Sequence, residues 1–159
     1  LDRPGMDDFY PGMQTNIAPV EETINGVIVI DASDSVQGVV NKPYSFTMES
    51  GVITKVEGDG EADNMRNWLE SCNDPTIYKL CHYSLGLNPQ AGISGRMIED
   101  ERKFAAVDFG FGYQNPDFGG TVGLSDFHMD IMLANPTVIL DGKMMCSDGA
   151  FNPEMGFEE

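Results

Sequence analysis

The sequence predicts an α+β domain with a mainly antiparallel or mixed sheet that is built from hairpins and carries one or two helices. Two pairs of short segments rich in strand-forming residues are joined by Ser50-Gly51 and Asp141-Gly142, two-residue turns typical of antiparallel strands. One segment, Glu61 to Cys72, has its apolar residues at helical spacing. Hairpins with one clear helix favour an α+β domain over a doubly wound nucleotide-binding sheet.

The first half of the chain supplies a strand, a hairpin and the helix. Gly26 to Ser33 is an apolar, β-branched run bounded by turn formers, so we predict a buried strand. Pro43 to Glu49 and Val52 to Glu57 form the first predicted hairpin. The helix from Glu61 to Cys72 follows Asp59-Gly60, which are suited to a cap or a turn.

The second half supplies further strands and long loops. We predict strands at Lys103 to Gly112 and Phe127 to Leu133, although glycines weaken the first of these. Thr137 to Leu140 and Lys143 to Cys146 form the second predicted hairpin. The segment from Tyr113 to Ser125 is rich in Gly, Pro and Asn, which is typical of a loop that carries a site on a rigid sheet.

Length and composition indicate one globular domain. With 159 residues and 41% hydrophobic content, we expect a single domain over residues 1–159. No run approaches the roughly 18 apolar residues that cross a bilayer, and Leu1 to Gly5 lacks the character of a signal peptide. We therefore expect a soluble, cytoplasmic protein without a membrane partner. A net charge of -17 argues against nucleic acid as a partner.

Two scarce histidines and one aspartate form the candidate metal site. His82 and His128 are the only histidines in the chain, and His128-Met129-Asp130 lies in a predicted strand. Because strand side chains alternate, His128 and Asp130 project to the same face and can share one cation. Two histidines and one carboxylate are the ligands of many non-haem iron(II) sites, which leave positions open for substrate and dioxygen. On spacing alone, hydrogen-bonded structural histidines remain the alternative.

The three cysteines do not indicate a second kind of site. Cys72, Cys81 and Cys146 are odd in number and contain no Cys-x-x-Cys pair, so neither a disulfide framework nor a thiolate zinc site is predicted. We expect all three to be reduced.

The chain resembles a known group of metalloproteins over roughly Pro11 to Gly149. The motifs that carry this resemblance are Thr15 to Asp31, Leu85 to Pro89, Ile98 to Glu101 and His128 to Asp130. They are similar to the C-terminal domain shared by aminopeptidase T-type metallopeptidases and the 2,5-dihydroxypyridine 5,6-dioxygenases.

The resemblance implies a ligand set. The peptidases hold two metals with Glu, Glu, His, His and Asp, and the matching positions here are Gln14, His82, Asp108, His128 and Asp130. The histidine at position 82 gives the dioxygenase pattern, so the resemblance implies iron(II) (Fe²⁺) held by two histidines and one aspartate. Zinc or cobalt is the alternative metal.

The implied reaction is ring cleavage of a dihydroxylated N-heteroaromatic such as 2,5-dihydroxypyridine, with dioxygen as co-substrate. Tyr83, Asp108 and Tyr113 are the candidates for moving protons. A dinuclear leucyl aminopeptidase-like enzyme and a non-catalytic assembly domain are the alternative functions. Family members are about twice as long, so the chain resembles their C-terminal half, and an exposed former domain interface favours a homo-oligomer. The sequence leaves open how Gln14 affects substrate handling.

Overall fold

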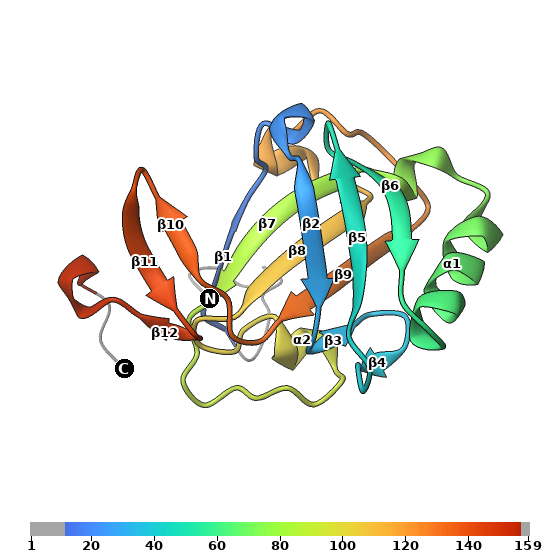
Figure 1. Ribbon diagram of the computed structural model, residues 1–159. Helices are drawn as coiled ribbons and strands as arrows, with labels where there is room; N and C mark the ends of the chain where they lie inside the picture. Colours follow the sequence, from blue (N-terminus) through green and yellow to red (C-terminus); the bar gives the residue numbers. More distant parts are fainter. Residues whose placement is uncertain (1–11, 157–159) are drawn as a thin grey trace, which may run out of the picture.

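The computed structural model describes residues 12–156, which form three antiparallel sheets and a few short helices (Figure 1). The central sheet contains, in spatial order, β1 (Gln14–Ile17), β7 (Leu80–Gly86), β8 (Val107–Gly112), β9 (His128–Leu133), β3 (Ser33–Asp34) and β4 (Gly38–Val39). The second sheet contains β2 (Gly26–Ile30), β5 (Tyr44–Glu49) and β6 (Val52–Glu57). The third contains β10 (Val138–Leu140), β11 (Lys143–Ser147) and β12 (Ala150–Phe151).

Helices are few in the described residues. The two α-helices are α1 (Glu61–Cys72) and α2 (Met97–Asp100), and the 3-10 turns are η1 (Glu21–Thr23), η2 (Pro75–Tyr78), η3 (Pro116–Phe118) and η4 (Pro153–Met155). Neither α-helix has the length and apolar character needed to cross a bilayer. The predicted α+β class is confirmed, and so are both hairpins and the bounds of α1.

Three strand predictions need correction. The segment predicted as a buried strand from Gly26 to Ser33 forms β2 only as far as Ile30, and this strand is half-exposed because Val27 and Val29 face solvent. Strand β8 begins at Val107, because the chain turns through residues 103–106 and Ala105 has a left-handed φ of 58°. Strand β7 was not predicted at all, although it carries His82. Six of its seven residues are buried, so the strand lacks the alternation of polar and apolar residues that indicates a half-buried strand.

One face of the central sheet is apolar and covered. Phe111, Met129 and Ile131 pack with α1 and the second sheet in a single core cluster. The rings of Phe46 in β5 and Phe111 meet edge to face at 5.8 Å between centroids. Figure 1 shows the second sheet lying across β7, β8 and β9, with α1 beside β6. This packing fixes the central sheet as a rigid platform.

The third sheet covers the other end of the same face. Leu85 and Val107 of the central sheet pack against Cys146 and Phe151. Phe104, in the turn before β8, meets Phe151 edge to face at 4.9 Å. Because these two clusters cover the apolar face, the polar side chains of β7, β8 and β9 lie on the opposite face.

Candidate metal centre

The register of three neighbouring strands brings the candidate ligands together. His82 in β7 lies opposite Gly110 in β8, which lies opposite Asp130 in β9. Partners in an antiparallel ladder point to the same face, so His82 and Asp130 face each other across Gly110. His128 lies two residues before Asp130 in β9 and projects to the same face.

Gly110 makes room for the imidazole of His82. A Cβ atom at position 110 would lie 2.1 Å from Cε1 and 2.3 Å from Nδ1 of His82, far inside van der Waals contact. The ring therefore lies directly over the backbone of β8 and reaches toward β9. The glycine that weakens the strand pattern in the sequence is a requirement of this arrangement.

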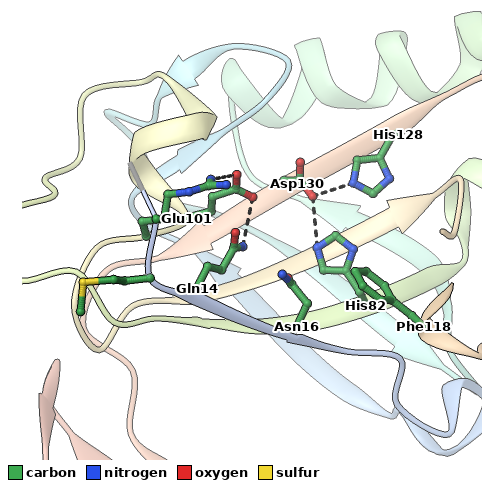
Figure 2. Close-up of a pocket in the computed structure, with 10 residues that line it drawn as sticks. Gln14, Asn16, His82, Glu101, Phe118, His128 and Asp130 are labelled. Carbon is green, nitrogen blue, oxygen red and sulfur yellow. Dashed lines mark hydrogen bonds and ion pairs between the residues drawn. The ribbon is translucent and has the colours of Figure 1, made fainter. Parts of the chain in front are cut away.

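Both imidazoles converge on one carboxylate oxygen (Figure 2). Oδ1 of Asp130 lies 2.8 Å from Nε2 of His128 and 3.5 Å from Nε2 of His82. The two rings are stacked, with centroids 5.3 Å apart and planes inclined by 22°. Donor atoms that bind one ion at about 2.1 Å lie roughly 3 Å apart at neighbouring positions. Both imidazoles of the predicted set, those of His82 and His128, therefore face one oxygen of Asp130.

Asp108 lies beneath this group and is fully buried. Its Oδ2 lies 3.0 Å from Nε2 of His82 and accepts a hydrogen bond of 2.8 Å from Oγ of Ser84. Its Oδ1 has no hydrogen-bond partner among residues 12–156, which is costly for a buried carboxylate oxygen. Within the described residues, two groups have donor atoms that all lie within 4.8 Å of one another, as a shared cation requires: His82 with Asp108 and Asp130, and His82 with Cys81 and His128. Imidazole nitrogens and carboxylate oxygens suit iron(II) and zinc alike.

Burial and the contacts within this cluster change the pKa of His82, His128 and Asp108. Burial alone would lower the pKa of His82, but the hydrogen bond to Asp108 and the contact with Cys81 outweigh it and raise this pKa to about 10. In the same way Asp130 raises the pKa of His128 to about 11 against the effect of burial. Burial and the charge of Asp130 raise the pKa of Asp108 to about 6. An environment that favours positive charge on both imidazoles also favours a cation.

Contacts behind the rings set the direction of their nitrogens. Nδ1 of His128 lies 2.9 Å from the main-chain carbonyl of Tyr113, to which it can donate a proton, leaving Nε2 toward Asp130. Sγ of Cys81 lies 3.6 Å from Nδ1 of His82 and 3.9 Å from Nδ1 of His128. Burial raises the pKa of the Cys81 thiol, but these two histidines outweigh it and lower this pKa.

The structure does not bring the two candidate tyrosine side chains to the ligands. Tyr83 lies on the opposite face of β7, in an apolar cavity of about 360 Å³ bordered by β1 and the β10–β11 hairpin. Its buried hydroxyl has no hydrogen-bond partner within the described residues. The side chain of Tyr113 is 39% exposed, and this residue meets His128 through its main chain. Of the three proton-transfer candidates, only Asp108 presents its side chain to the cluster.

A pocket of about 280 Å³ opens in front of the candidate ligands. Its lining residues are Gly12, Met13, Gln14, Asn16, His82, Glu101, Arg102, Phe118, His128 and Asp130. Four of these residues were not predicted from the sequence as part of a site, namely Asn16, Glu101, Arg102 and Phe118. Alternation along β1 gave a usable signal for Asn16, because this residue shares a face with Gln14.

Glu21 anchors the loop that carries Phe118. The ring of Phe118 meets His82 edge to face at 6.4 Å between centroids. Glu21, which is buried, accepts hydrogen bonds of 3.0 Å from Nε2 of Gln114 and 2.6 Å from the main-chain N–H of Thr121. Thr121 Oγ1 adds a third bond of 3.0 Å. Residues 113–125 are thus held to η1, and they close one side of the pocket.

Glu21→Gln is expected to destabilise the protein by about 2 kcal/mol at neutral pH, because it removes charge-assisted hydrogen bonds to this loop. Burial alone would raise the pKa of Glu21, but Gln114 and Thr121 outweigh it and lower this pKa from 4.5 to about 2. A lowered pKa stabilises the fold above pH 4.5, and that stabilisation is lost as the pH falls through about 2. Urea unfolding of both proteins between pH 7 and pH 2 measures the difference.

The difference in unfolding free energy between wild type and Glu21→Gln should shrink across the acid range. The exposed neighbour Glu22 provides a matched control, and Glu22→Gln should change the unfolding free energy little. A Glu21→Gln effect of constant size from pH 7 to pH 2 would contradict the assignment of a charged anchor.

Comparisons with known proteins agree on one family. The model of the 2,5-dihydroxypyridine 5,6-dioxygenase family matches residues 1–153. A 2,5-dihydroxypyridine 5,6-dioxygenase from Pseudomonas putida KT2440 is 28% identical over 158 residues, which cover 93% of this chain and 45% of that enzyme. The solved structure of 2,5-dihydroxypyridine dioxygenase from the same organism aligns with a TM-score of 0.73 and 25% identity, over 85% of this chain and 42% of that one. The chain therefore spans less than half the length of these relatives.

Proposed function

This chain belongs to the 2,5-dihydroxypyridine 5,6-dioxygenase family, and from that premise we propose that it forms the metal-binding part of a ring-cleaving dioxygenase. The substrate class is a dihydroxylated N-heteroaromatic such as 2,5-dihydroxypyridine, with dioxygen as co-substrate. The observation that supports this most strongly is the convergence of His82 and His128 on a single oxygen of Asp130, at the floor of a pocket.

His82, His128 and Asp130 would hold iron(II) in this proposal. When bound, iron(II) supplies a redox centre at which an electron-rich ring and dioxygen react, so that a ring carbon–carbon bond breaks and both oxygen atoms enter the product. The three ligands would come from two positions of β9 that share one face and from one position of β7, and all three residues line the pocket in which a substrate would bind.

The remaining residues bind the ring and handle protons. Phe118 forms an apolar wall beside His82, suited to the face of a planar ring. Asp108 lies next to His82 and presents its buried carboxyl to the cluster, which makes it the candidate for proton transfer. Tyr83 and Tyr113 are less suited to this role, because neither hydroxyl is in contact with the ligands.

We propose that residues 1–159 form one metal-binding domain. A further domain or a neighbouring subunit would cover the polar face of its central sheet. The pocket lies on the face of the central sheet that the second and third sheets leave uncovered. Relatives of about twice the length have additional chain to cover such a face. A cover would exclude water from the reacting ring.

Two measurements test the proposal: the metal content of the purified protein, and its dioxygen uptake in an oxygen electrode. Anaerobically purified full-length chain is expected to hold one iron per chain and to consume one dioxygen for each 2,5-dihydroxypyridine cleaved. Two zinc or cobalt ions per chain with hydrolysis of leucyl substrates would support the aminopeptidase alternative instead. A protein that folds without stoichiometric metal and consumes no dioxygen would support an assembly domain.

A further inference from the structure

We propose that Gln14 and Asn16 form the edge of the pocket that recognises the ring nitrogen of the substrate, with Gln14 accepting a hydrogen bond from a ring N–H. The site would thereby select the lactam form of a hydroxylated N-heteroaromatic over a carbocyclic diol of the same shape. This inference rests on the proposed function, since it assumes that a ring binds in front of the candidate ligands.

Neighbouring groups fix the orientation of the Gln14 amide. Its Nε2 donates to Oγ of Ser84 at 2.9 Å and to Oε2 of Glu101 at 3.1 Å, so both amide protons are used. Glu101 is ion-paired with Arg102, and a carboxylate only accepts hydrogen bonds. The amide nitrogen must therefore face Glu101, as Figure 2 shows. The carbonyl oxygen is left as the free hydrogen-bonding atom of Gln14.

That carbonyl oxygen makes no hydrogen bond with any other described residue, although Gln14 lines the pocket. Ser84 cannot reverse the pattern, because its hydroxyl already donates to the buried carboxylate of Asp108. The chain of donors thus runs in one direction, from Gln14 through Ser84 to Asp108. The pocket is left with a fixed acceptor at position 14.

Asn16 supplies a second polar group on the same edge. It lies two residues further along β1, opposite Ser84, and so projects to the same face as Gln14. Its side chain makes no hydrogen bond within residues 12–156, and in Figure 2 its amide lies between Gln14 and His82 at the pocket. An amide offers both a donor and an acceptor, so Asn16 can bind the oxo or hydroxyl group beside the ring nitrogen.

The position of this edge matches the shape of the proposed substrate. In the proposed binding mode, one hydroxyl lies near His82 and Asp130 and the opposite edge of the ring faces β1, whose Gln14 and Asn16 line the same pocket. A ring with C–H in place of N–H leaves the acceptor of Gln14 unpaired. If the bound ring shields this acceptor from water, losing its partner should weaken binding by about tenfold to hundredfold.

Anaerobic titration calorimetry of the iron-loaded full chain tests the inference without turnover. The two probes are 2,5-dihydroxypyridine and benzene-1,4-diol, which have similar shapes but differ at the ring nitrogen. Wild type should bind the pyridine about tenfold to hundredfold more tightly. Gln14→Met keeps the length of the side chain but removes the amide, so it should reduce this preference to nearly one. Asn16→Leu should weaken binding of both rings.

Thr15→Val is the matched control, because Thr15 lies between the two residues on β1 and lines the cavity on the other face. It should leave both affinities unchanged. Equal binding of the two probes by wild type, or an undiminished preference in Gln14→Met, would overturn the inference while the proposed function stands. Should Gln14→Met fail to fold, unaltered binding by Asn16→Leu overturns the edge assignment instead. Absence of binding of either ring to wild type would overturn both proposals.

Discussion

His82→Ala and His128→Ala are each expected to weaken iron(II) binding by about 100-fold or more and to abolish oxygen uptake with 2,5-dihydroxypyridine. Each change removes one imidazole of the two that approach Oδ1 of Asp130. Loss of a residue that only orients a metal ligand already costs about 10-fold to 100-fold, so loss of a ligand itself should cost at least as much. Metal content after dialysis against a buffered iron(II) concentration measures the effect.

The two variants differ in how cleanly they test the ligand assignment. The side chain of His128 is 34% exposed, so its truncation should leave the fold intact. His82 is buried, and His82→Ala also leaves a cavity over β8. Urea unfolding of the metal-free variants separates the two effects, and Lys55→Ala on β6 provides an exposed control remote from the site. Full iron content in both histidine variants would refute the assignment.

Patterns confined to one segment predicted much of the fold. The helix from Glu61 to Cys72 was predicted with its observed bounds because apolar spacing and the preceding turn are both local signals. The two hairpins followed from their turn residues. His128 and Asp130 were placed on one face by strand alternation, and the structure has them on that face.

The strand that carries His82 shows where local patterns failed. Strand β7 is paired on both sides, with β1 and β8, and its polar side chains are buried in hydrogen bonds of the site. A strand whose side chains are buried on both faces shows no polar and apolar alternation, so periodicity could not identify it. Once the strand is known, Tyr83 must face away from His82, because neighbouring residues on a strand point to opposite faces.

The wall of the pocket depends on contacts between distant segments. Glu101 reaches Gln14 across 87 positions of sequence, through the pairing of β1 with β7 and the turn before β8. Nothing in the local sequence of either residue indicates this contact. The same holds for Glu21, whose partner Gln114 is 93 positions away.

Gly110→Ala is expected to weaken iron(II) binding by about 10-fold to 100-fold, although residue 110 contributes no ligand atom. The added methyl group would lie 2.1 Å from the ring of His82, between that ring and the backbone of β8. The central sheet is fixed by core packing on its other face, so the imidazole must move away from Asp130. Such overpacking should also cost about 1 to 3 kcal/mol of stability in the metal-free protein.

A double-mutant cycle identifies the cause of this effect. If Gly110→Ala acts by displacing the imidazole, it should cost little further stability in a His82→Ala background, because the clashing atoms are gone. Gly92→Ala is the matched glycine control, since a Cβ there meets its nearest neighbour only at 4.0 Å. Equal destabilisation by Gly110→Ala in both backgrounds would instead place the strain in β8 itself. The spacing of glycine and histidine across β7 and β8 would then have no role in holding the metal.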